Sequence, residues 1–167
     1  MPLHFFAGLL LALHFHNPRG ESKHRLYEVK PKTGDHPDGA QVDFDDSNWR
    51  EEVPQYDTLF WLRGNVRLEK NTEPFVPLGI AIEMAASYEL YWDGTKIGQN
   101  GRVGKTAADE IPGKYLRLFA IPGSLATAGD HKIAFRISSF DGNAPFAWGW
   151  PLIDQLLELQ RLPFTII

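Results

Sequence analysis

Cysteine is absent from the 167-residue chain, and this absence excludes several chemistries at once. Without a thiol there is no disulfide, no zinc or iron–sulfur cluster held by thiolates, and no cysteine nucleophile. Positive charge is also scarce, because 17 Lys and Arg stand against 21 Asp and Glu and leave a net charge of −4. A protein that binds duplex nucleic acid needs a basic surface against the phosphates. We therefore expect no nucleic-acid partner.

A hydrophobic run long enough to span a membrane is missing at the N-terminus as well. The apolar stretch at residues 3–15 holds about a dozen apolar positions, fewer than the ~20 of a membrane-spanning helix but typical of a signal peptide. Residues 1–16 are therefore predicted to be a signal or leader segment, which implies an extracytoplasmic location, periplasmic or at the cell surface. A buried N-terminal segment is the alternative. The apolar residues 162–167 fit either a last strand or the start of a membrane segment.

The sequence is rich in apolar, aromatic and turn-forming residues. Apolar residues make up 43% of the chain and aromatic residues 13%, beside 15 Gly and 12 Pro. This composition suffices for the core of one globular domain. The frequent Gly and Pro indicate short segments rather than long helices.

Apolar and polar residues alternate over most of the chain after its N-terminal quarter, which is the period of half-buried β-strands. Turn-forming pairs such as Asp93-Gly94 separate the alternating stretches. The pattern predicts an antiparallel β-sandwich or jelly roll. The sets that would face its core are Phe60, Leu62, Val66 and Leu68; Ile80, Ile82 and Met84; Tyr88, Leu90 and Trp92; and Ile133, Phe135 and Ile137.

The other segments mark the boundaries of this sandwich. Residues 17–41 are polar and rich in Pro and Gly, so they are predicted to form an arm before a sandwich that spans residues 42–151. The only good helical pattern covers residues 152–162 and is stopped by Pro163. It predicts a short C-terminal helix, followed by an apolar tail, within residues 152–167.

Four segments, in this order, resemble one known layout. Residues 44–49 (FDDSNW) and 60–63 (FWLR) are similar to the FDDSxW and FWYR elements in the sugar-binding domain of family 2 glycoside hydrolases. Residues 91–98 (YWDGTKIG) resemble its Asn-Gly hairpin, and residues 122–137 (PGSLATAGDHKIAFRI) resemble its GxN-containing strand. The resemblance implies the galactose-binding-like jelly roll, an all-β antiparallel sandwich.

The chain departs from this layout at two positions. Asp93 stands where the hairpin usually has Asn, and His131 stands where the GxN element has its Asn. These departures leave the implied fold intact but weaken any inherited ligand contact.

The same kind of domain also serves as an extracytoplasmic sensor in bacterial membrane signalling proteins, including seven-transmembrane receptors and sensor kinases. Residues 143–157 (NAPFAWGWPLIDQLL) look more like the ending of those sensors than like the linker to a hydrolase barrel. The resemblance thus implies a non-catalytic sensing domain for a carbohydrate or small polar ligand, with a membrane segment or signalling domain as partner. The alternatives are an accessory sugar-binding domain of a family 2 hydrolase and a purely structural protein-interaction module.

The candidate ligand-binding residues are aromatic, amide and charged side chains near predicted loops. An exposed indole offers a flat apolar surface and one N–H donor, which suits the face of a sugar ring. The residues predicted to bind ligand are Trp92, Asp93, Asn100, Arg102, Trp148 and Trp150. A structural alternative stays open for three of them: Asp93 as a turn residue, and Trp148 and Trp150 as covers for the end of the sandwich.

Two further sets of residues have an ordinary structural interpretation. The acidic cluster at residues 45–47 could hold calcium. The favoured interpretation is that it caps a short turn, with Trp49 anchored in the core. Arg63 and Arg136 are predicted to lie solvated on strand faces.

Nothing in the sequence points to catalysis. Glycoside hydrolysis needs two carboxylates about 5–10 Å apart, whereas the adjacent pairs Glu51-Glu52 and Asp109-Glu110 would point to opposite faces of a strand. The six His form neither H-x-x-x-H nor H-E-x-x-H, and no G-x-S-x-G, P-loop or G-x-G-x-x-G is present. We expect a non-enzyme without catalytic residues, metal or cofactor.

Overall fold

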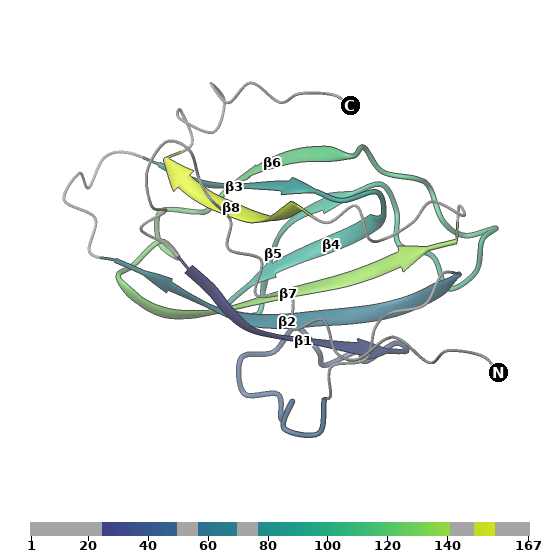
Figure 1. The fold of residues 1–167 in the computed structure, drawn as a ribbon, viewed down its shortest axis with the longest axis horizontal. Helices are drawn as coiled ribbons and strands as arrows, with labels where there is room; N and C mark the ends of the chain where they lie inside the picture. The colour runs from purple at the N-terminus through teal and green to yellow at the C-terminus, as the bar shows by residue number, and fades with distance from the viewer. Residues whose placement is uncertain (1–24, 50–56, 70–76, 141–148, 156–167) are drawn as a thin grey trace, which may run out of the picture.

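The computed structural model describes residues 25–49, 57–69, 77–140 and 149–155, and the regular structure in these ranges consists of β-strands (Figure 1). In chain order the strands are β1 (Arg25–Thr33), β2 (Thr58–Leu68), β3 (Leu78–Glu83), β4 (Ser87–Trp92), β5 (Thr95–Asn100), β6 (Leu116–Ala120), β7 (Gly129–Ser139) and β8 (Gly149–Gln155). The predicted all-β class is confirmed.

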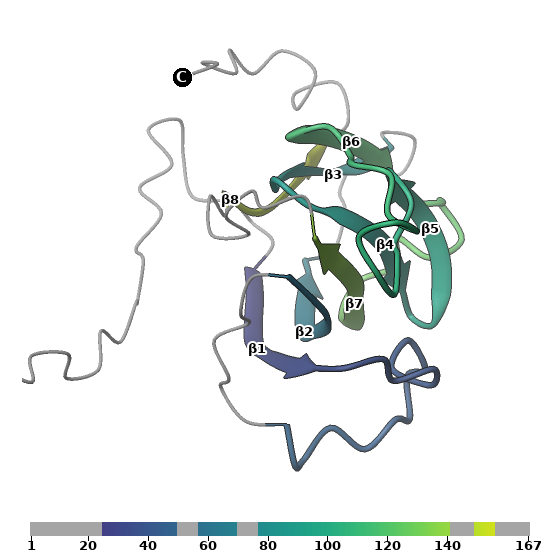
Figure 2. The ribbon, with the colours of Figure 1, turned by 90° about the vertical axis from the view of Figure 1, so that its right-hand side faces the viewer.

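The strands form two antiparallel sheets that lie over one another as layers (Figure 2). The larger sheet has the order β1-β2-β7-β4-β5, and the smaller sheet has the order β6-β3-β8. β2 and β7 pair along their whole length, from Thr58 opposite Ser139 to Leu68 opposite Gly129. Because strands distant in sequence become neighbours in the sheet, the topology is that of a sandwich of the jelly-roll type. The predicted antiparallel β-sandwich is confirmed.

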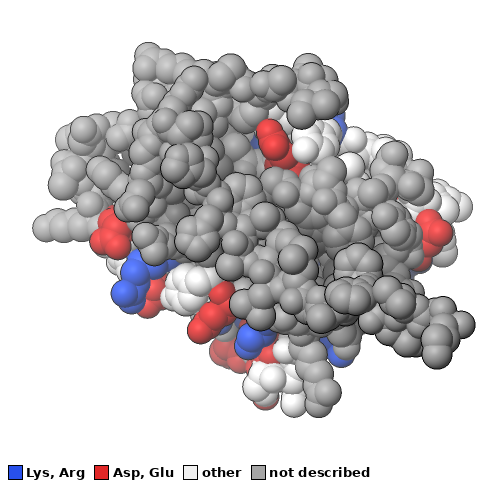
Figure 3. Space-filling view, in the orientation of Figure 1, with Lys and Arg blue, Asp and Glu red and all other residues white. Residues whose placement is uncertain are grey.

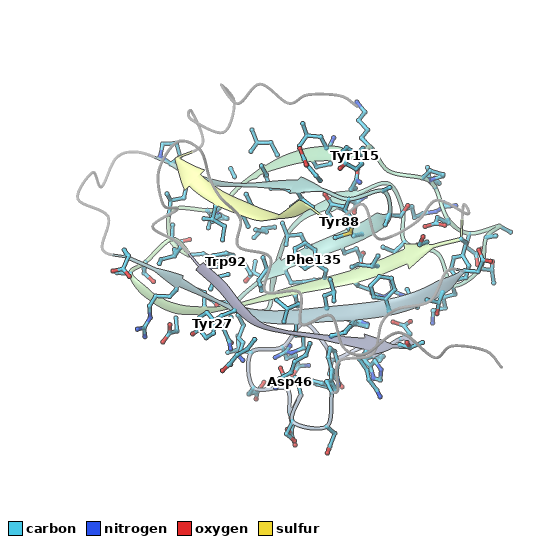
Figure 4. All side chains as sticks on the ribbon, in the orientation of Figure 1. Tyr27, Asp46, Tyr88, Trp92, Tyr115 and Phe135 are labelled. Atoms are coloured by element: carbon cyan, nitrogen blue, oxygen red, sulfur yellow. The ribbon has the colours of Figure 1, made fainter. Side chains whose placement is uncertain are left out.

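The space between the sheets is filled by the apolar side chains that the alternation predicted to face inward. Figure 4 shows Tyr88, Trp92 and Phe135 among them. Burying one large apolar side chain stabilises the fold by about 1.5–3 kcal/mol. All members of the predicted sets are buried in one cluster: Phe60, Leu62, Val66, Leu68, Ile80, Ile82, Met84, Tyr88, Leu90, Trp92, Ile133, Phe135 and Ile137.

β1 lies inside the segment that was predicted to be a polar arm, residues 17–41. It pairs with β2 at the edge of the larger sheet, where Pro31 is tolerated because an edge strand needs fewer ladder hydrogen bonds. A bulge at Glu28, with a positive φ of 52°, interrupts the pairing. The bulge and the charged sequence of the strand break the hydrophobic period, and for this reason the period did not reveal β1.

β8 occupies the start of the predicted C-terminal helix. Its Leu152 and Ile153 pair with β3, and Ile153 is buried in the core. Short apolar runs do not distinguish a strand from a helix by period alone, and pairing with β3 decides for the strand here. The rest of the predicted helix, residues 156–162, lies outside the described residues, as does the predicted leader.

The structure also bears on membrane crossing. Within the described ranges, no helix is long and apolar enough to span a bilayer.

Candidate functional site

The structure does not bring the predicted ligand-binding residues together. Trp92 and Asp93 lie at the end of β4 where the hairpin turns into β5, whereas Asn100 lies at the far end of β5 and Arg102 follows it. Trp148 is outside the described residues. Trp150 belongs to β8 by its backbone, and its side chain is not described.

Trp92 is part of the core and offers no surface to a ligand. Its exposed fraction is 0%, because β4 alternates and places this residue on the same inner face as Tyr88 and Leu90. The indole Nε1 donates to the Leu125 carbonyl at 3.1 Å. The ring centre lies 5.0 Å from that of His131. This burial agrees with the inward set in which the alternation places Trp92, and it leaves no exposed ring surface for the predicted ligand contact.

Asn100 is buried and ties the end of β5 to two other segments of backbone. Its Nδ2 donates to the carbonyls of Ala86 at 3.1 Å and Lys114 at 2.7 Å, and its Oδ1 accepts from the Lys114 N–H at 2.8 Å. These bonds occupy the amide with protein partners. Arg102 is exposed, and its Nε donates to the Asp109 carbonyl at 2.9 Å, which closes the loop after β5.

Asp93 sits in a tight hairpin turn and stays accessible. Asp93 and Gly94 have positive φ values of 46° and 77°, as a type I′ hairpin turn requires, so the predicted turn is of this type. The carboxylate accepts from the Lys132 N–H at 2.8 Å, and its other oxygen lies 2.6 Å from His131 Nδ1. The Asp93 side chain is 28% exposed.

The contact between Asp93 and His131 joins the two positions at which the chain departs from the resembled layout. His131 is buried, and its Nε2 lies 2.7 Å from the Thr127 carbonyl. Where the layout has two Asn, this chain has a carboxylate and an imidazole in direct contact. Because the residues are 38 positions apart, only the folded strands reveal that the two departures are coupled.

The outer face of the larger sheet is partly covered by a loop, which no local pattern in the sequence indicated. Residues 34–49, which we name the clamp loop, lie over this face and are held there by Arg63, whose side chain is 1% exposed. Its Nη1 donates to the carbonyls of Gly39 and Gln41, the latter at 2.9 Å, and its Nε donates to Asp46 at 2.9 Å. The expectation of a solvated Arg63 is wrong, because the clamp loop covers it.

The first two segments of the resemblance, residues 44–49 and 60–63, therefore contact each other in the folded chain. Asp46 binds Arg63, and the Phe44 ring lies 5.3 Å from the guanidinium carbon. Trp49 and Trp61 pack in the same small apolar cluster. Figure 4 shows Asp46 on the side of β1 that faces away from the smaller sheet.

The acidic cluster at the end of the clamp loop forms a turn, as the favoured interpretation predicted. Asp45 accepts the backbone N–H of Ser47 at 2.9 Å, and Trp49 is buried. Burial opposes ionisation of Asp46, but hydrogen bonds from Lys30 and Arg63 outweigh it and lower the pKa of this carboxyl. Both oxygens of Asp46 are thus occupied by cations of the protein.

A second group of charges joins the clamp loop to β4 and β7. Arg136 of β7 donates through Nε and Nη2 to the two carboxylate oxygens of Asp35, each at 2.9 Å. Glu89 of β4 accepts from Lys96 at 2.7 Å and from the Tyr91 hydroxyl at 3.0 Å. Arg136 was expected to be solvated, but this network and the clamp loop leave its side chain only 18% exposed.

These contacts keep the acidic groups of the outer face ionised. The hydrogen bond from Arg136 lowers the pKa of Asp35 to about 2. Burial of Glu89 is outweighed by its bonds from Lys96 and Tyr91, so its pKa is lowered too, and burial raises the pKa of Tyr91 to about 12. A general acid for glycoside cleavage needs the opposite shift. The arrangement suits hydrogen bonding rather than proton transfer.

Replacement of Asp35 by Asn should reveal the contribution of this pair as a pH dependence. A carboxyl whose pKa is lowered on folding stabilises above its unfolded value, near 4, and loses this contribution as the pH falls toward 2. We expect Asp35→Asn to lower the free energy of unfolding by about 1–2 kcal/mol at pH 7, after allowance for partial exposure. Urea unfolding should show the difference from the wild type shrinking between about pH 4 and 2; a difference that does not vary with pH would contradict this.

The charges that are visible on the surface do not gather by sign. In Figure 3 the acidic and basic groups of the described residues lie next to one another. Among these same residues there is no group of three or more His, Asp or Glu placed to hold a metal ion.

The sequence matches no protein-family model and no curated protein. Solved structures do match the fold. A β-glycosidase from Bacteroides vulgatus has a TM-score of 0.55 at 15% identity, over 81% of this chain and 20% of that chain. A glycosyl hydrolase family 2 member from Bacteroides cellulosilyticus also has a TM-score of 0.55, at 11% identity, over 80% and 21%.

A Bacteroides uniformis β-glucuronidase gives a TM-score of 0.51 at 16% identity, over 80% of this chain and 17% of that chain. The chain therefore spans about a fifth of the length of these proteins. Its structural neighbours are family 2 glycoside hydrolases, and it shares with them the fold of one β-sandwich domain.

Proposed function

We propose that this chain acts as a non-catalytic accessory domain of a glycosidase related to family 2, where it supports recognition of the carbohydrate substrate. One observation carries the proposal: the fold match covers about four fifths of this chain but only about a fifth of each enzyme. A domain of that share accompanies a catalytic domain rather than replacing it.

Two features of the chain support a recognition role. Four segments follow the layout of the sugar-binding domain in order, and the contact of Asp46 with Arg63 joins the first two of them. The described carboxylates of the outer face with resolved pKa shifts are lowered, which disfavours a role as general acid. An extracytoplasmic location is part of the proposal, because family 2 resemblance and the apolar residues 3–15 are compatible with export.

The sensor function suggested by residues 143–157 stays a prediction. Most of that segment lies outside the described residues, and the structural neighbours are hydrolases. No described contact favours signalling over substrate recognition.

The test is binding without turnover. The full chain is titrated with lactose, cellotriose and p-nitrophenyl β-glucuronide by calorimetry and by NMR, and the chromogenic glucuronide also reports hydrolysis. We expect saturable binding of at least one sugar and no release of nitrophenol. The proposal would be overturned by a rate of nitrophenol release that rises in proportion to the protein concentration, or by the absence of binding to all three sugars.

A further inference from the structure

Asn100 and Gly101 form the one Asn-Gly pair of the sequence, and the structure gives each of them a specific task. The Asn100 amide makes the three hydrogen bonds described above, with the backbone of Ala86 and Lys114. Gly101 has a positive φ of 66°, a conformation that favours glycine. A Cβ at this position would also collide with the Ile111 carbonyl. The fold therefore needs both members of the pair.

An Asn-Gly pair can lose ammonia in an ordinary reaction of the polypeptide chain. The backbone nitrogen of the glycine gives up its proton to a base in water and attacks the side-chain carbonyl carbon of the asparagine. The new C–N bond closes a succinimide ring, and the side-chain nitrogen leaves as ammonia. Water then opens the ring at either carbonyl, which gives aspartate or its β-linked isomer. Glycine hinders the attack least, because it has no side chain.

In the folded protein the surroundings of Asn100 oppose this reaction. The residue is 2% exposed, and a Cβ at Gly113 would collide with its amide, so the amide is tightly enclosed. Attack would turn the planar amide into a tetrahedral centre, and departure of ammonia would break both hydrogen bonds that Nδ2 donates. The enclosing loop is fixed by two backbone hydrogen bonds between Arg102 and Ile111, of 2.9 and 3.0 Å. The reaction therefore requires that this part of the chain opens first.

The products of the reaction do not fit the site that the amide occupied. In aspartate an oxygen replaces Nδ2, and it would face the carbonyl oxygens of Ala86 and Lys114, which are acceptors like itself. A buried carboxylate that meets acceptors instead of donors bears the desolvation cost of its charge without compensation. The β-linked isomer adds a carbon to the backbone at the end of β5, where Asn100 pairs with Tyr88. Both products therefore disfavour a return to the native structure.

We propose that Asn100 is a modification site that is closed in the folded protein and opens when the chain unfolds, and that its deamidation makes unfolding irreversible. The amide nitrogen is lost as ammonia, water supplies the oxygen of the new carboxylate, and hydroxide acts only as the base. The inference goes beyond sugar recognition, because it concerns how long the domain stays native and not what it binds. Chains that remain folded keep Asn100, whereas chains that stay unfolded lose the ability to return.

The first measurement compares the reaction in the folded and the unfolded full chain. The protein is incubated at mildly alkaline pH in buffer and in concentrated guanidinium chloride, and its peptides are then analysed by mass spectrometry. Asn100 should deamidate at least about a hundredfold faster in the denaturant, because reaction through an opened state follows the small population of that state. Asn65, which precedes Val66, is the internal control and should remain an amide in both samples. Equal rates in the two solutions, or equal rates at Asn100 and Asn65 in the denaturant, would refute the proposal.

The second measurement tests whether the product can fold. Asn100→Asp should either fail to fold or have a thermal unfolding midpoint more than about 5 °C below that of the wild type. The matched control is Gln99→Glu, the same change of amide to carboxylate on the neighbouring residue, which is exposed and whose Oε1 accepts from Lys96 at 2.9 Å. Its midpoint should stay within about 2 °C of the wild type. If Asn100→Asp were as stable as Gln99→Glu, deamidation would not trap the unfolded chain, and the inference would fail.

Discussion

Replacing Arg63 by Ala is expected to destabilise the protein by about 3 kcal/mol and to release the clamp loop. Removing one partner of a buried ion pair costs about 3–5 kcal/mol, because the other charge stays buried without its counter-charge. Here the carbonyls of Gly39 and Gln41 would lose a donor. The low end of the range applies, since Asp46 keeps its bond from Lys30. Urea unfolding measures the loss.

The matched control for this variant is Arg67→Ala. Arg67 lies on the same face of β2 and is also paired with an aspartate, but its side chain is 61% exposed. An exposed ion pair contributes little to stability, so the unfolding midpoint of Arg67→Ala should stay close to that of the wild type. Limited proteolysis adds a second measurement, because only Arg63→Ala should expose the clamp loop to cleavage. Equal midpoints for the two variants would show that burial of Arg63 is not what holds the loop.

Replacing Trp92 by Ala is expected to cost about 3–5 kcal/mol of the free energy of unfolding. The loss combines the transfer energy of a fully buried indole with the cavity left between the sheets. The variant also leaves the Leu125 carbonyl without its indole donor. Trp92→Phe keeps most of the apolar area and loses only that donor and part of the volume. Its free energy of unfolding should therefore lie between those of the wild type and of Trp92→Ala.

Sugar binding by the same variants separates a core role from a ligand role. Trp92→Phe should bind lactose or cellotriose as the wild type does, because the indole has no exposed surface. A variant that unfolds at the wild-type midpoint but no longer binds sugar would contradict the core assignment. Equilibrium unfolding in urea and calorimetric titration at one temperature provide both quantities.

The inward-facing residues could be predicted from the sequence because alternation is a local property. It placed Trp92 in an inward set with Tyr88 and Leu90, and the structure agrees. The prediction of Trp92 as a ligand contact rested on the chemistry of the indole ring. It did not take into account that the alternation of β4 turns this ring inward. At this position the period was the better guide.

The contacts that shape the surface could not be predicted in the same way. Arg63 and Asp46 are 17 residues apart, and Asp93 and His131 are 38 apart. No local pattern encodes such pairs; they depend on which strands become neighbours and on which loop crosses the sheet. For the same reason Arg63 and Arg136 were expected to be solvated, since a strand pattern does not show what lies over its outer face.

The central position of β7 also has a consequence for how the chain folds during synthesis. β2 and β4 both hydrogen-bond to β7 and not to each other, yet β7 follows them by dozens of residues. When β2 and β4 leave the ribosome, the strand that joins them has not been made. The larger sheet must therefore assemble late and slowly, as folding dominated by non-local pairing does. Until then, its apolar strands depend on dilution or chaperones to stay apart from other chains.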